Sequence, residues 1–198
     1  MAFSVTFTPR NASLAKAVRE FASVSKAAIP GLLDDAGRYM VRTHIPEVFA
    51  TSGAAAGESW PSVGRGGQPL LDTGTLRRSF GHMVTGKRLT ISTPLPYAGL
   101  QNEGGTVRPV RAKKLTIPAS SLSISERRTF KARGYKDAFV TKSKAGNLVL
   151  MQRTSSGLRL LATLVDESII PRRTFLTWSQ RAQNEIIERW AIALAGEA

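Results

Sequence analysis

The stretch PLLDTGTLRRSF, residues 69–80, places Asp-Thr-Gly behind two leucines, which is how an aspartic protease presents its catalytic carboxylate. That chemistry needs two aspartates that share one proton, and a short chain supplies them by pairing two copies. Here Leu76 and Phe80 follow at a spacing of four, which predicts one helical turn, capped by Asp72 or Thr73, in place of further β structure. The adjacent arginines would also lower the carboxylate pKa, although one carboxyl of a protease dyad must stay protonated. We therefore interpret the motif as a turn.

The remaining candidate residues do not combine into a catalytic or metal-binding pattern. Cysteine is absent, which excludes a thiol nucleophile, a disulfide framework and a zinc knuckle. His44 and His82 are the only histidines, and only His44 has a carboxylate, that of Glu47, at a spacing suited to binding one metal ion. We therefore expect each histidine to face solvent or to form hydrogen bonds. Adjacent Asp34 and Asp35 would diverge by about 100° on a helix and could not converge on one ion. These observations predict a protein that is not an enzyme and holds no cofactor or metal.

The strongest compositional signal is the positive charge. Lysine and arginine number 28 against 14 acidic residues, which gives a net charge of +14 and a pI near 11.1. Residues 101–160 alone contain thirteen basic and three acidic residues, so the excess is regional. Such a balance predicts an acidic partner, which could be nucleic acid, a membrane surface or an acidic protein. No apolar run approaches the roughly 20 residues that span a bilayer, and we expect a soluble protein.

The segment SERRTFKARGYK, residues 125–136, interleaves basic residues with Phe130 and Tyr135. The cations could bind a nucleic-acid backbone while the two rings stack on bases. In the alternative interpretation the rings anchor a core and the charges face solvent, and the segment by itself leaves both interpretations open. The residues that we expect to face a polyanion or an acidic partner are Arg127, Arg128, Lys131, Arg133, Lys136, Lys142 and Lys144.

The N-terminal part of the chain predicts one strand and two helices. Apolar residues alternate with polar ones over 3–7, which is typical of a half-buried strand. A first helix would begin near residues 11–13, and Pro30 with the glycine after it would break or kink this helix. A second amphipathic segment would run over 32–49, with a kink at Pro46 near its end. Its expected core residues are Leu33, Ala36, Met40, Ile45 and Val48.

The rest of the chain predicts a long loop, short strands and a terminal helix. Residues 51–69 are rich in glycine, serine and proline, and we expect Trp60 to hold this loop to the core. Strands are expected at 88–93, 115–119, 137–142, 147–153 and 158–165. A helix over 174–195 would bury the stripe Trp178, Ala182, Ile186, Trp190 and Leu194, widened by Ile187 and Ala191. The predicted class is a single α+β domain: an antiparallel sheet packed against an N-terminal and a C-terminal helix, with a glycine-rich loop and a β-hairpin insertion.

Four motifs stand in an order that resembles a known family. They are GESWP after Gly53, then the stretch 69–80, then YAGLQNEGG at 97–105, then IPRRTFL at 170–176. They are similar to the Gly-x-x-Trp-Pro, Leu-x-x-Thr-Gly-x-Leu-x-x-Ser, Tyr-Ala-x-x-(His or Gln)-x-x-Gly-Gly and Ile-Pro-x-Arg-x-Phe-Leu motifs of virion morphogenesis proteins. These are the tail-completion or neck proteins of Mu-like and related tailed bacteriophages. Residues 113–164 resemble a basic, β-rich insertion that only some members carry.

The resemblance implies a structural virion protein. Its subunits would form a hexameric ring at the head–tail junction, as a tail terminator, tail-completion or connector layer that joins the tail tube to the head and lets DNA pass. The implied partners are further copies of the chain, the tail tube protein and connector or portal-side proteins, with weak non-specific contact to genomic DNA and no membrane. The ring would lie in the neck of the virion after assembly in the host bacterial cytoplasm.

The resemblance also bears on particular residues. In the family the Thr-Gly-x-Leu-x-x-Ser stretch is a structural turn into a short helix, which agrees with the interpretation of Asp72 above. The residues expected to anchor the loop or to contact another subunit are Trp60, Leu71, Leu76, Tyr97 and Phe175. The alternative function is sequence-independent binding of nucleic acid through the basic region 108–159.

Overall fold

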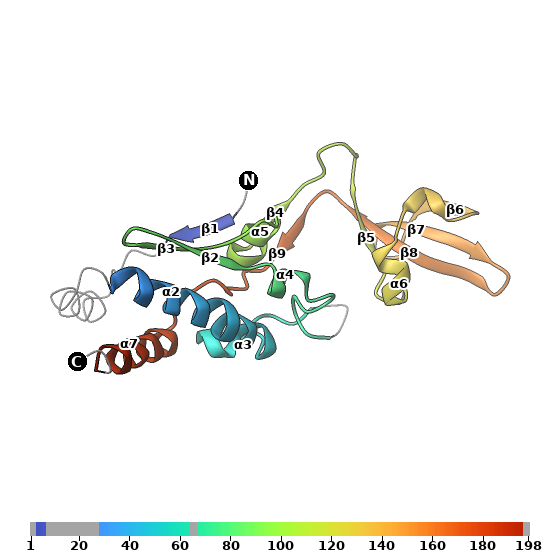
Figure 1. Cartoon of the computed structure of the whole chain (residues 1–198). Helices are drawn as coiled ribbons and strands as arrows, with labels where there is room; N and C mark the ends of the chain where they lie inside the picture. The colour runs from blue at the N-terminus through green and yellow to red at the C-terminus, as the bar shows by residue number, and fades with distance from the viewer. Residues whose placement is uncertain (1–2, 7–27, 64–66, 196–198) are drawn as a thin grey trace. The chain divides into compact units, whose positions relative to one another are not determined.

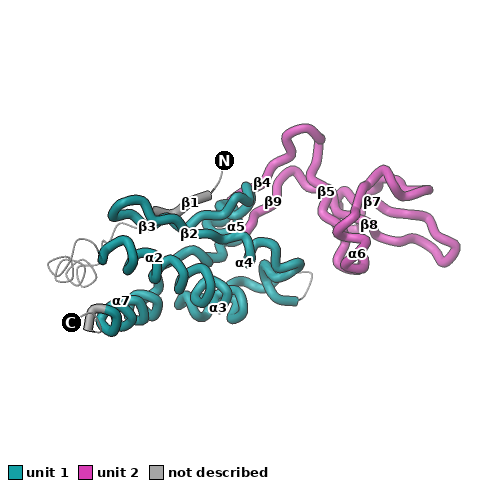
Figure 2. The backbone as a smooth tube through the Cα atoms, in the orientation of Figure 1, with its two compact units in different colours: residues 1–104, 171–198 teal, residues 105–170 magenta. Residues whose placement is uncertain are grey.

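The computed structural model describes residues 3–6, 28–63 and 67–195 of the 198-residue chain. The helix predicted to begin near 11–13 lies outside the described residues. The chain divides into two compact units, coloured separately in Figure 2: unit 1 comprises Met1–Gly104 with Pro171–Ala198, and unit 2 comprises Gly105–Ile170. Both contain antiparallel strands and helices, so the α+β class is confirmed.

Unit 1 contains a three-stranded antiparallel sheet of order β1-β3-β2 (Figure 1). Its strands are β1 (Phe3–Thr6), β2 (Gly81–Thr85) and β3 (Arg88–Thr93). The sequence predicts β1 and β3, but it does not predict β2, because GHMVT has too few apolar residues to show a period. Alternate residues of β3, beginning with Leu89, are buried in the core.

The helix that packs against this sheet begins at a proline. α2 spans Ile29–Tyr39, has Pro30 in its first turn, and packs against β2 and β3. A proline at this position is favourable, because its φ already suits the helix and its missing N–H would have no partner there. Pro30 therefore starts a helix here. The five core residues predicted for 32–49 are all buried, at 9 % exposure or less.

The second proline of this segment follows a wider helical turn. α2 continues through a π-helical turn, Met40–His44, into α3 (Ile45–Ala50). The N–H of Ile45 donates to the carbonyl of Met40, five residues back instead of four. Pro46 lacks an N–H and its ring crowds the carbonyl four residues before it, so the wider turn accommodates it.

The C-terminal helix is shorter than predicted. α7 spans Gln180–Ala195, whereas residues 171–179 are not helical. Ala182, Ile186 and Trp190 of the predicted stripe are buried, and the Trp190 Nε1 donates to the carbonyl of Leu32 in α2 at 2.9 Å. Ala191 is exposed, so the stripe does not widen on that side. Within the described part of the chain, no helix combines the length and apolar character that crossing a bilayer requires.

Unit 2 contains a four-stranded antiparallel sheet of order β5-β8-β7-β6. Its strands, β5 (Leu115–Pro118), β6 (Ala138–Lys142), β7 (Leu148–Thr154) and β8 (Gly157–Val165), are the four predicted for this region. The range 113–164, expected to be an insertion, lies inside this unit. A short pair that the sequence did not predict, β4 (Gly105–Val107) with β9 (Ser168–Ile170), completes the unit.

A small core covers one face of this sheet. α6 (Ile124–Arg128) begins with a capping box, in which Ser123 and Glu126 exchange side-chain to backbone hydrogen bonds. The basic segment 125–136 is partly helical, through α6 and a 3₁₀ turn at Ala132–Gly134. The buried residues of the core are Ala119, Leu122, Leu150, Leu161 and Ala162.

Candidate functional site

The motifs that carry the family resemblance meet in unit 1. Phe49 of α3 is surrounded by three rings, at centroid distances of 5.4 Å to Trp60, 6.4 Å to Phe80 and 5.3 Å to Phe175. These three rings belong to the GESWP, LDTGTLRRSF and IPRRTFL motifs, and all are buried. Segments far apart in the sequence are therefore joined through one aromatic cluster.

Trp60 holds the long loop to the core, as predicted. Its side chain is 7 % exposed, and its Nε1 donates to the carbonyl of Thr174 at 3.1 Å. Gly53 lies against the ring with φ of 93°, and a Cβ at this position would overlap the indole. The side chain is buried in its own chain, so little of its surface remains for contact with another subunit.

A buried amide joins two further motifs. Asn102 lies in α5 (Ala98–Glu103), is 2 % exposed and accepts hydrogen bonds from the backbone N–H groups of Phe175 and Leu176, both at 3.0 Å. Its amide nitrogen donates to Glu103. Sequence reasoning missed this role, and the position of Asn102 inside the YAGLQNEGG motif was the only available signal.

Arg173 adds a second connection between the same segments. Its backbone N–H donates to the carbonyl of Gln101 at 3.1 Å. Its guanidinium is almost fully buried and donates to the carbonyl of Pro61, 3.3 Å from Nη2. These bonds end on backbone carbonyls, so they fix the course of the chain.

Asp72 lies at the turn expected from the sequence. α4 (Thr75–Arg78) follows it, which confirms the helical turn in place of the β structure of a protease motif. Gly74, with φ of 72°, occupies the N-cap position, so neither Asp72 nor Thr73 is the N-cap residue. The Thr73 hydroxyl instead accepts from the N–H of Thr75 at 3.3 Å.

The other expected anchors differ in exposure. Leu76 and Phe175 are buried, Leu71 is half-buried, and Tyr97 is 44 % exposed. Tyr97 also lines a cavity of about 210 Å³, together with Asp72. Tyr97 thus has the accessible surface that a contact with another subunit requires, and that contact stays a prediction.

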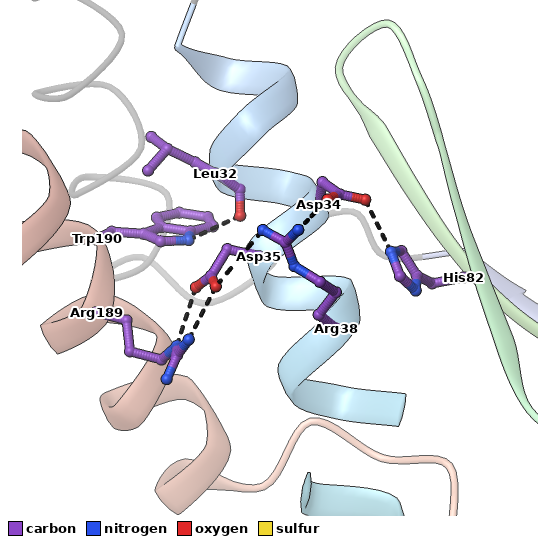
Figure 3. A network of polar contacts seen from close by, with 7 residues as sticks. All are labelled: Leu32, Asp34, Asp35, Arg38, His82, Arg189 and Trp190. Carbon is purple, nitrogen blue, oxygen red and sulfur yellow. Dashed lines mark hydrogen bonds and ion pairs between the residues drawn. The ribbon is translucent and has the colours of Figure 1, made fainter. Parts of the chain in front are cut away.

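A polar network connects α2 with β2 and α7 (Figure 3). His82 Nε2 donates to Asp34 Oδ1 at 2.9 Å, and Arg38 forms an ion pair with Asp34 at 3.1 Å. Asp35 accepts two hydrogen bonds from Arg189, at 2.8 and 2.9 Å. The hydrogen bonds from His82 and Arg189 hold the pKa of the two carboxyls below their ordinary values. Arg38 lies within 4.0 Å of both adjacent carboxylates, through different guanidinium nitrogens, and among the described residues no His, Asp and Glu side chains gather in a group able to hold a metal ion.

The other histidine is buried and, of the two expected roles, has the hydrogen-bonded one. His44 lies in the π-helical turn with no exposed surface, and its Nε2 is 3.5 Å from the hydroxyl of Ser179. Its Nδ1 has no hydrogen-bond partner within the described part of the chain. Burial lowers the pKa of the ring, which therefore stays neutral at pH 7.

The predicted basic residues lie in unit 2, from α6 to the turn after β6. Arg128, Lys131, Arg133, Lys136, Lys142 and Lys144 are exposed, and Arg127 is half-buried. Phe130 and Tyr135 contact each other at a centroid distance of 5.3 Å and pack against the core of unit 2. This packing favours the interpretation of the two rings as core anchors over stacking on bases.

Unit 2 carries a large positive charge, because it contains thirteen basic and four acidic residues, a net charge of +9. Three of the acids pair with Arg108, Lys114 and Arg159, which lie outside the predicted set. Lys131, Arg133, Lys136, Lys142 and Lys144 of that set are exposed, so their positive charge is accessible to a partner molecule.

Comparison of the chain with protein-family models, with curated proteins and with solved structures finds no match.

Proposed function

We propose that this chain is a structural subunit of a tailed-bacteriophage virion and forms a ring of roughly six copies at the head–tail junction. The observation that supports this proposal best is the set of contacts in unit 1 that connects the four motifs of the resemblance. Its central residues are Trp60, Phe80, Asn102 and Phe175. Their interactions with rings and backbone groups keep a loop, two short helices and an extended segment in one arrangement, which suits a protein that presents fixed surfaces.

Exposed sheet edges supply a means of assembly. The sheet of unit 1 ends at β1 and β2, and the four-stranded sheet of unit 2 ends at β5 and β6. The outer backbone groups of an edge strand can pair with a strand of a neighbouring subunit. A closed ring uses two different patches of each subunit, head to tail, and edges on separate sheets meet this requirement.

The charge favours acidic neighbours in the assembly. A ring of six copies would concentrate roughly 84 positive charges, and their mutual repulsion opposes assembly unless acidic groups lie nearby. We propose the faces of adjacent tail-tube or connector rings as the main counter-charge. Contact with DNA in the lumen would be weak, because tight phosphate binding would hinder passage of the genome.

Assembly with tail tubes tests this function. The purified chain is measured by light scattering, alone and with tail tubes isolated from the same phage, and the mixture is imaged by electron microscopy. We expect particles of one defined size and a ring of added density at the end of the tube. A chain that stays monomeric alone and leaves the tube ends bare would contradict the junction role.

A second candidate function is favoured by the exposed cations of unit 2, and it is sequence-independent binding of nucleic acid. In this case a duplex of about 20 base pairs should bind with a steep negative dependence on salt. Replacing four cations with glutamine, at Arg127, Arg128, Lys131 and Arg133, should lower the slope of log K against log salt by up to about 3–4. The matched control replaces four exposed cations of unit 1, Arg42, Lys87, Arg88 and Arg172. Equal slopes for the two variants would exclude this surface as the nucleic-acid site.

A further inference from the structure

The four-stranded sheet of unit 2 has one face covered by its own chain. Cross-strand partners lie on the same face, and so do residues two apart on one strand. By this rule Leu150 and its partner Ala162 share a face, and both belong to the small core. Phe130 and Tyr135 pack against this core, and Glu126 of α6 accepts from Arg159 on the same face.

The other face of the sheet is apolar and is exposed on β5 and β8, although Val149 of β7 is buried there. We call it the open face and define it by Ile117, Phe139, Val149, Met151, Leu158 and Leu160, which the strand pairing places together. Leu158 is 66 % exposed, Ile117 41 % and Leu160 38 %. The solvent-facing side of an antiparallel sheet ordinarily carries polar residues. A contiguous apolar surface in that position marks a place where another molecule binds.

The charge beside the open face is positive. Arg153 is the charged residue that the pairing of β5 to β8 places on this face, and its guanidinium lies over the ring of Phe139 at 5.3 Å. The turn between β6 and β7 adds the exposed Lys144 near one end of the sheet, whereas Lys142, the partner of Leu148, lies on the covered face. The acidic residues Asp166 and Glu167, just after β8, are held in ion pairs.

We propose that the open face is the docking surface for an acidic protein, whose contacting surface has an apolar centre flanked by carboxylates. The apolar residues would pack against the centre, and Arg153 with Lys144 would pair with the carboxylates. The inference rests on unit 2 alone and holds whether or not the chain forms a junction ring.

A second copy of this chain does not suit the open face. Strands about 4.8 Å apart with a rise of about 3.3 Å per residue give four strands of five residues an area of roughly 300 Å². Stable interfaces bury about 800 Å² per partner, so any protein bound here must also bury surface outside the open face. A second copy is disfavoured by charge, because two copies would bring units of net charge +9 together.

Nucleic acid does not suit the open face either. A phosphate backbone offers no apolar surface to Leu158 or Leu160, and the one aromatic ring of the face, Phe139, is already covered by Arg153. The cations near α6, such as Arg133, belong to the segment that packs on the covered face of the sheet. A protein surface therefore fits better than DNA.

Binding of synthetic peptides to the full-length chain tests this proposal. The probe is a twelve-residue peptide in which leucine alternates with glutamate, and its control has serine in place of leucine at the same charge. We expect the leucine peptide to bind at least about tenfold more tightly, and Leu158→Thr with Leu160→Thr to remove this preference. Threonine keeps the β propensity of the strand. Ile124→Thr, an exposed apolar residue in α6, is the matched control and should have no effect.

Charge variants separate the open face from the overall positive charge. Arg153→Gln should weaken binding of the leucine peptide, whereas Arg133→Gln, which removes the same charge elsewhere in unit 2, should not. Three results would overturn the proposal. They are equal binding of the two peptides, loss of duplex DNA binding in the double leucine variant, and a concentration-dependent dimer of the native chain that this variant abolishes.

Discussion

Asn102 offers the sharpest test of how the motifs work, because one side chain joins two of them. Its carbonyl accepts from two backbone N–H groups, those of Phe175 and Leu176, at 3.0 Å each. Both bonds are buried, so water cannot replace the acceptor. We predict that Asn102→Leu, which roughly keeps the volume but removes the acceptor, strongly destabilises unit 1.

The expected magnitude follows from the two N–H groups that lose their partner. Each buried, unpaired donor costs about 1–3 kcal/mol, so the free energy of unfolding of unit 1 should fall by about 2–6 kcal/mol. The matched control is Asn184→Leu in α7, where the asparagine is exposed and accepts a bond from Gln180. An exposed substitution of this kind should change the free energy of unfolding by less than about 0.5 kcal/mol.

Tryptophan fluorescence during urea unfolding measures this free energy for unit 1 specifically. The chain has three tryptophans, Trp60, Trp178 and Trp190, and all lie in unit 1. The free energies of unfolding of each variant and the native chain are compared at the same m value, which is the slope of this free energy against urea concentration. If Asn102→Leu lowers the free energy of unfolding by less than about 1 kcal/mol, or by no more than Asn184→Leu does, the Asn102 amide does not hold the two motifs together.

Two further predictions concern unit 1, and the same fluorescence assay measures both. Gly53→Ala should lower the free energy of unfolding by more than about 3 kcal/mol, because its Cβ would meet the ring of Trp60. Gly57→Ala should lower it by only about 1 kcal/mol, because Gly57 has a similar φ of 94° but open space around it. Equal losses for the two variants would contradict the packing argument. The free energy of unfolding should fall as pH decreases below about 6.5, since the pKa of buried His44 is lowered and the unfolded ring takes up the proton first. His44→Phe should reduce this dependence, and an unchanged slope between pH 7 and 5 would exclude His44 as its source.

Local patterns in the sequence determined much of the secondary structure. Strands β3 and β5 to β8 were predicted within about two residues, because alternating apolar residues between turn sequences require no distant partner to be recognised. The helical period likewise identified the buried residues of 32–49, and the spacing of Leu76 and Phe80 identified the turn around Asp72. The sequence also identified the basic region, although the order of these residues along the chain did not show where each one lies on the folded surface.

The tertiary structure decided the features that depend on residues distant in sequence. α7 begins at Gln180 and not at Thr174, and in the non-helical segment before it the N–H groups of Phe175 and Leu176 donate to the distant Asn102. β2 becomes a strand only by pairing with β3, since its own sequence has a weak period. The open face exists because strand pairing places Ile117, Phe139 and Leu160 side by side while α6 covers the opposite face. Propensity acts over a few neighbouring residues, whereas pairing and burial join segments that only the folded chain brings together.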